Sequence, residues 1–131
     1  MIFVDSSFWI ALVRPRDVHH AEATTLLQAK AERLVTSNHV RGETWTFLRR
    51  RDGHRVAAAF LDRIDRTRRL DVFFVREQLE AQALRWLRRH DERPYSFVDA
   101  TSFALMRSLK IREALAFDGD FAAAGFVELR A

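Results

Sequence analysis

The chain has 131 residues, 48% of them hydrophobic and 11% aromatic, with 22 basic and 18 acidic residues and a formal net charge of +4. This length suits one domain, and the composition excludes a disordered chain and a coiled coil. The absence of cysteine excludes a disulfide framework and a cysteine-based zinc site. Twenty of the 22 basic residues are arginine, whose planar guanidinium suits phosphate, so the composition favours a polyanionic partner.

No apolar run approaches the roughly 20 residues that a membrane span requires. The opening residues Met1–Asp5 contain neither a basic region nor the small-residue cleavage site of a signal peptide. We therefore expect a cytoplasmic protein with no membrane partner, folded as one domain over residues 1–131.

Apolar runs and helical spacings predict an alternation of short strands and helices. In chain order these are a strand at Ile2–Val4, a helix from about Phe8, a helix over Val18–Ala31, a strand at Leu34–Thr36, a helix capped by Ser37 or Asn38 that ends at Gly53, a helix over Arg55–Arg66, a strand at Val72–Val75, a helix around Leu79–Leu87 that ends before Pro94, a helix over Ser96–Leu109, and strands at Ala114–Phe117 and Phe126–Leu129. This alternation indicates crossover connections, so the predicted fold is a three-layer α/β domain with a parallel five-stranded sheet flanked by helices.

Four acidic residues occupy positions that can meet at one edge of this sheet. Asp5 and Asp118 directly follow predicted strands, and Glu43 and Asp99 lie in the first turns of predicted helices. Ligands of open parallel sheets bind outside the carboxyl ends of the strands. Carboxylates gathered there raise one another's pKa unless cations neutralise them, and Mg²⁺ and Mn²⁺ prefer such oxygen ligands.

Each acid also has a local structural interpretation. Asp5 can cap a helix, Ser96-x-x-Asp99 fits a capping box, and an acid at position 43 suits the positive end of a helix dipole. The segment Asp118-Gly119-Asp120 is typical of a turn. The alternative function is therefore a non-catalytic, basic RNA- or partner-binding α/β domain whose acids are structural caps.

Two other enzyme classes with acids at strand ends do not fit. A haloacid-dehalogenase-type phosphatase needs a second aspartate two residues after the first, where this chain has Ser7. A response-regulator receiver needs an aspartate after its third strand, where this chain has Arg76.

Four segments resemble the motifs of one nuclease family. They are Met1–Ser7, Arg41–Thr44 with the trailing Leu48–Arg50, Tyr95–Ala100, and Phe117–Phe121 followed by Ala124–Phe126. In this order and spacing, over residues 1–129, the sequence resembles PIN-domain ribonucleases, specifically the VapC-type toxins of type II toxin–antitoxin pairs. Two positions depart from the family pattern. Ala116 stands where the family often has Thr or Ser, and Asp120 stands where a basic or aromatic residue is common.

The resemblance implies an Mg²⁺- or Mn²⁺-dependent endoribonuclease that cleaves RNA phosphodiester bonds with metal-activated water. Asp5, Asp99 and Asp118 would bind the metal, Glu43 would hold a second metal or its water shell, and Asp120 is a further candidate ligand. The resemblance also implies a cognate VapB-like antitoxin and a homodimer.

Hydroxyl and guanidinium groups near the acids are candidates for contact with phosphate, and they are Ser6, Ser96, Arg14, Arg16, Arg49, Arg50 and Arg51. The serines suit turns and caps equally well, and the arginine run equally suits a solvated helix end. Several apolar residues can line an antitoxin groove or belong to the core, and they are Phe8, Trp9, Leu12, Val13, Trp45, Phe47 and Leu48.

Overall fold

Five short parallel strands form the sheet at the centre of the molecule. The computed structural model describes all residues, 1–131, and its strands are β1 (Ile2–Val4), β2 (Leu34–Ser37), β3 (Leu70–Phe73), β4 (Glu113–Leu115) and β5 (Val127–Glu128). The strand order is β3-β2-β1-β4-β5, and every pairing is parallel. The predicted α/β fold with a parallel five-stranded sheet is confirmed.

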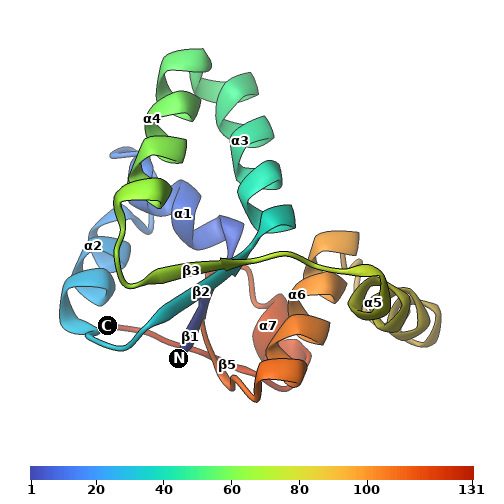
Figure 1. The fold of residues 1–131 in the computed structure, drawn as a ribbon. Helices are drawn as coiled ribbons and strands as arrows, with labels where there is room; N and C mark the ends of the chain where they lie inside the picture. Colours follow the sequence, from blue (N-terminus) through green and yellow to red (C-terminus); the bar gives the residue numbers. More distant parts are fainter.

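Seven helices cover the two faces of the sheet, and they are α1 (Ser6–Val13), α2 (His20–Ala29), α3 (Asn38–Asp52), α4 (His54–Arg66), α5 (Glu77–Arg89), α6 (Phe97–Leu109) and α7 (Asp120–Ala123). Figure 1 shows α1–α4 on one side of the sheet and α5–α7 on the other, with α3 and α4 packed as a hairpin that extends away from it. Gly53 makes the tight turn of this hairpin with a φ of 95°, a conformation that side chains disfavour.

The core is built around the central strand β1 and the buried part of helix α6. All three residues of β1 are fully buried, as a strand covered on both faces requires. Every residue of α6 from Asp99 to Met106 is also buried. Phe8, Trp9, Leu12 and Leu48 belong to this core, so the groove interpretation of these four residues is wrong. The other three candidates, Val13, Trp45 and Phe47, pack partly buried against it.

Two strands begin and end earlier than predicted. β3 covers Leu70–Phe73 rather than Val72–Val75, because it pairs with β2 from Leu70 onward and the N–H of Val75 instead donates to Oδ1 of Asn38 at 2.8 Å. β4 covers Glu113–Leu115 rather than Ala114–Phe117, because the N–H of Phe117 donates to the Ser7 hydroxyl rather than to a strand.

The helix predictions differ at three places. The first helix begins at Ser6 rather than near Phe8, because Asp5 caps it. The second covers His20–Ala29, two residues shorter at each end than Val18–Ala31. The four-residue α7 lies where the sequence predicted only a turn. None of the helices combines the length and apolar character that crossing a bilayer requires.

Candidate active site

The two acids that follow strands lie at the point where the order of the sheet changes direction. β1 pairs with β2 on one side and with β4 on the other, so the chain runs outward from β1 in both directions. Asp5 and Asp118 follow these two neighbouring strands, and the N–H of Asp5 donates to the carbonyl of Leu115 at 3.0 Å. Such a switch point opens a crevice outside the carboxyl ends of the strands, which is where this fold class binds ligands.

Asp5 is held by one carboxylate oxygen and has the other unpartnered. Its Oδ2 accepts hydrogen bonds from the backbone N–H of Ser7 at 3.1 Å and from the Ser7 hydroxyl at 2.8 Å. Its Oδ1 is buried without a hydrogen-bond partner. A buried carboxylate oxygen without a partner is costly, and a bound cation would compensate for it. The sequence analysis gave Ser7 no role of its own, although an aspartate that precedes a helix commonly accepts from the backbone N–H two residues on.

Asp99 is both a helix cap and a member of the acidic group. The N–H of Asp99 donates to Oγ of Ser96 at 2.9 Å, and the N–H of Ser96 donates to Oδ2 of Asp99 at 3.0 Å. This is the capping box that the sequence offered as the alternative to a ligand. Because it uses Oδ2 alone, Oδ1 remains free for a second role.

Three aspartates form a group with the dimensions of a cation site. Asp99, Asp118 and Asp120 each place one carboxylate oxygen within 4.8 Å of the others. Oδ1 of Asp118 accepts a hydrogen bond from the N–H of Asp120 at 3.0 Å, and Asp120 forms an ion pair with Arg93 at 2.9 Å. The sequence prediction missed Arg93, because no motif marks a residue that lies 27 positions from its partner.

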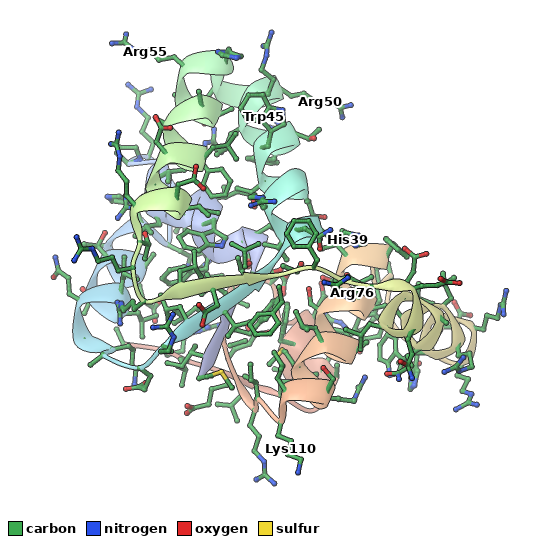
Figure 2. The ribbon with its side chains drawn as sticks, in the orientation of Figure 1. His39, Trp45, Arg50, Arg55, Arg76 and Lys110 are labelled. Carbon is green, nitrogen blue, oxygen red and sulfur yellow. The ribbon has the colours of Figure 1, made fainter.

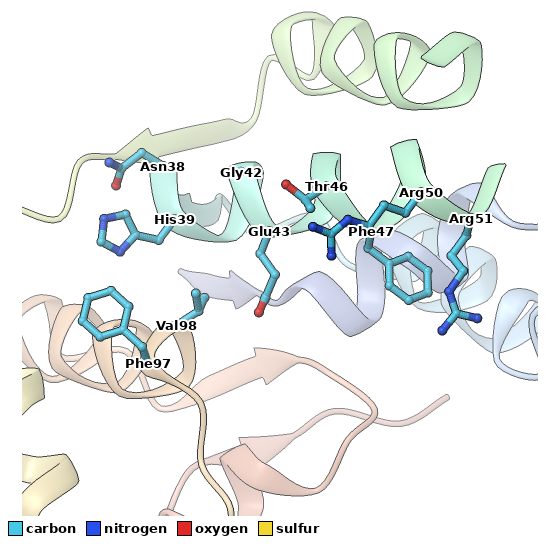
Figure 3. A pocket seen from close by; sticks show the side chains of 10 residues that line it. All are labelled: Asn38, His39, Gly42, Glu43, Thr46, Phe47, Arg50, Arg51, Phe97 and Val98. Atoms are coloured by element: carbon cyan, nitrogen blue, oxygen red, sulfur yellow. The ribbon is translucent and has the colours of Figure 1, made fainter. Parts of the chain in front are cut away.

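Glu43 lies on α3 and contacts the residue that follows Asp5. The Ser6 hydroxyl donates to Oε2 of Glu43 at 2.7 Å, which ties α3 to the start of α1. Figure 3 shows the Glu43 side chain extending from α3 toward the middle of a pocket, with Val98 of α6 on the opposite wall. Glu43 is therefore linked to Asp5 through the neighbouring Ser6, and it is not one of the three acids that share a cation-sized space.

Burial and mutual repulsion raise the pKa of three of these carboxyl groups. Burial, then the charge of Asp118, raises the pKa of Asp5 well above its ordinary value, although hydrogen bonds from Ser7 oppose this. Burial, and then the charges of Asp118 and Asp120, raises the pKa of Asp99 to about 7, although the Ser96 N–H opposes this. Burial, and then the charges of Asp120 and Glu128, raises the pKa of Asp118, although the N–H of Asp120 opposes this. The arrangement favours either bound protons or bound cations.

These shifts predict how the stability of the metal-free protein depends on pH. The pKa of Asp99 is near 3.8 unfolded and about 7 folded, so the folded chain binds more protons in this range. The free energy of unfolding should then fall as pH rises from about 4 to about 7, and Asp5 and Asp118 act in the same direction. Thermal unfolding in EDTA should give a lower Tm at pH 8 than at pH 5, and added Mg²⁺ should raise the Tm more at pH 8. A Tm in EDTA that is higher at pH 8 would contradict the repulsion.

The arginines proposed to contact RNA divide into two places. Arg50 and Arg51 line a pocket of about 750 Å³ that also contains Glu43. Arg14 and Arg16 line a second pocket of about 320 Å³, where Arg14 pairs with Asp52 at 2.9 Å. Arg49 is exposed and lines neither pocket. Figure 2 shows Arg50 extending outward from α3, with His39 at the other end of the same helix.

The fold and the acidic group together define a nuclease-like α/β domain, and the family comparison agrees. The family model of the PIN domain matches residues 2–127, so this chain belongs to the PIN domain family. The predicted family resemblance is confirmed.

The similar proteins include characterised VapC nucleases. The chain is 57% identical over 131 aligned residues to the "23S rRNA-specific endonuclease VapC20" of Mycobacterium tuberculosis, covering 99% of this chain and 98% of that protein. It is 25% identical to a "VapC ribonuclease" of Archaeoglobus fulgidus, covering 90% and 77% of the two chains.

Two solved structures share the fold. The crystal structure of M. tuberculosis VapC20, described as a "Sarcin-Ricin loop cleaving toxin", matches with a TM-score of 0.96 and 55% identity over all of both chains. The structure of FitAcB from Neisseria gonorrhoeae matches with a TM-score of 0.72 and 14% identity, over 98% of this chain and 96% of that one. The second match supports the fold alone.

Proposed function

We propose that this protein is a metal-dependent endoribonuclease toxin of the VapC type that cleaves 23S rRNA in its sarcin–ricin loop. Membership of the PIN domain family and 57% identity over nearly the whole chain to a 23S rRNA-specific endonuclease support this proposal. The structural observation that carries it is the buried Oδ1 of Asp5, which has no partner in the protein and adjoins the group of aspartates.

The proposed roles follow from the oxygens that the protein leaves free. Asp5, Asp99 and Asp118 would hold a divalent cation, for which the carboxylate donors suit Mg²⁺ or Mn²⁺. Such a cation supplies a Lewis acid for the phosphoryl oxygens and lowers the pKa of water. Ser7 and Ser96 orient Asp5 and Asp99 by hydrogen bonds to their other oxygens.

Two further acids have supporting roles in this proposal. Glu43, oriented by Ser6, would hold a second cation or its water shell. Asp120 contributes negative charge beside Asp118, and Arg93 partly neutralises it. We therefore assign Asp118 as the ligand and keep Asp120 as a further candidate.

The non-catalytic alternative is less consistent with this site. Caps account for Oδ2 of Asp5 and Oδ2 of Asp99, as that alternative predicts. They do not account for a buried, unpartnered Oδ1 on Asp5 or for three aspartate oxygens within 4.8 Å.

The proposal is tested with a synthetic RNA hairpin that carries the sarcin–ricin loop sequence. We expect the purified protein, freed of bound partners, to cleave it in Mg²⁺ or Mn²⁺ and not in EDTA. A hairpin with the same stem and a shuffled loop is the control for target choice. Cleavage of both hairpins would support the nuclease and contradict the target, and no cleavage of either in metal would contradict the proposed activity.

The partners that the VapC resemblance implies stay predictions. A cognate VapB-like antitoxin and a homodimer are properties of this toxin class, and we propose both for this chain. A cytoplasmic location is proposed on the same basis.

A further inference from the structure

The pocket beside Glu43 has features that the cation site does not explain. It is lined by residues of α3 and by the first two residues of α6, and these are Asn38, His39, Gly42, Glu43, Thr46, Phe47, Arg50, Arg51, Phe97 and Val98. Figure 3 shows the rings of His39 and Phe97 opposite each other at one end and the guanidinium groups of Arg50 and Arg51 at the other.

We propose that this pocket is a nucleotide subsite, in which a base flanking the scissile phosphate stacks on Phe97 and a neighbouring phosphate binds Arg50 and Arg51. This inference rests on the proposed ribonuclease function and adds the residues that position the RNA.

The aromatic end of the pocket offers an open stacking surface. Phe97, the first residue of α6, is 39% exposed. Its ring centroid lies 5.6 Å from that of His39, with the planes inclined by 33°. Nδ1 of His39 has no hydrogen-bond partner in the protein. Unpaired RNA bases are commonly bound by stacking on such aromatic rings.

The two arginines at the cationic end of the pocket form no ion pair, unlike several other arginines of the chain. Arg14, Arg33, Arg93 and Arg130 all form ion pairs with acidic side chains. Arg50 and Arg51 form none, and the guanidinium of Arg51 lies 5.3 Å from the centre of the Phe47 ring, which supports it from one side. Their planar guanidinium groups suit a phosphate.

Two residues of the pocket are linked to the acidic group through neighbours in the chain. Glu43 lies between its two ends, and the Ser6 that holds Glu43 follows Asp5 directly. Phe97 lies two residues before Asp99 on the same helix. An RNA strand whose scissile phosphate lies at the aspartates would therefore pass along α3, which favours a nucleotide over an acidic peptide as the occupant.

The test compares KM and kcat for the sarcin–ricin hairpin in Mg²⁺. Phe97→Ala should raise KM about tenfold with a smaller change in kcat, and Phe97→Tyr should restore the wild-type value, because stacking needs an aromatic ring. Replacing both Arg50 and Arg51 with alanine should raise KM and reduce its dependence on salt concentration. Matched controls are Arg55→Ala and Phe74→Ala, which remove an exposed arginine and an exposed phenylalanine outside the pocket.

A second measurement separates this inference from the proposed activity. The Kd for the uncleaved hairpin is measured with the same variants placed in an Asp5→Asn background. Weaker binding by the pocket variants alone supports the subsite, whether or not the wild type cleaves this RNA. If Phe97→Ala and the double alanine variant of Arg50 and Arg51 both keep the KM and Kd of the wild type, the subsite is overturned and the nuclease proposal stays intact.

Discussion

Replacing Asp5 with asparagine is expected to reduce RNA cleavage more than about 100-fold. Loss of a residue that only hydrogen-bonds to a metal ligand costs at most about 100-fold, so a larger loss indicates that Asp5 itself is a ligand. The amide keeps an oxygen that can accept the Ser7 N–H, so the cap of α1 is retained. The substitution also removes a buried carboxylate whose pKa is raised by burial and by Asp118. The metal-free variant should therefore be at least as stable as the wild type at pH 8, and Mg²⁺ should raise its Tm less.

The measurement combines the cleavage rate with thermal unfolding in EDTA and in Mg²⁺. Asp62→Asn is the matched control, because it removes an exposed aspartate on α4 far along the chain from any site residue. Full activity of Asp5→Asn would remove Asp5 from the catalytic group. Inactivity combined with unfolding would show that its role is structural.

Asp99 separates the roles of ligand and cap when two substitutions are compared. Asp99→Asn and Asp99→Ala both remove the charge, and both should abolish cleavage. Only asparagine can still accept the hydrogen bond from the Ser96 N–H, so Asp99→Ala should be less stable than Asp99→Asn by about 1 kcal/mol, the typical net value of one such bond. Denaturant unfolding in EDTA measures this difference.

The reciprocal substitution provides the control. Ser96→Ala removes the other half of the capping box and should destabilise the protein by about 1 kcal/mol while all the acidic residues remain. Cleavage by Ser96→Ala in Mg²⁺ should stay within about tenfold of the wild type, because the backbone N–H of Ser96 that orients Oδ2 of Asp99 is retained. An active Asp99→Asn would refute the ligand role and leave the capping box as the function of this residue.

Much of the fold could be predicted from local sequence patterns. The errors lie at the ends of strands, where contacts with distant parts of the chain decide which residues pair. The run Val72–Val75 has strand propensity throughout, but pairing with β2 begins at Leu70 and leaves Phe74 57% exposed. Phe117 is apolar and follows a strand, but its N–H is taken by the hydroxyl of Ser7, 110 residues away. No local pattern encodes that contact, so the end of β4 was not predictable.

The residues of the candidate site also fall into those that local sequence marks and those that only tertiary contacts reveal. The sequence placed Asp5 and Asp118 at one edge of the sheet, because both follow strands and lie in family motifs, and their role as ligands stays a prediction. The residues that hold them in place were not predictable, because Ser7 and Arg93 act through contacts that only the folded chain creates. The exposed ring of Phe97 was also missed, since an apolar residue at a helix start is usually assigned to the core.

The pairing of β1 with β4 also orders the events of biosynthesis. Val4 lies opposite Leu115. The edge that carries Asp5 and Asp118 therefore cannot form until more than a hundred residues after the first strand have been synthesised. Contacts this distant in sequence form late in folding. Under the function proposed above, the chain would therefore be inactive through most of its own translation.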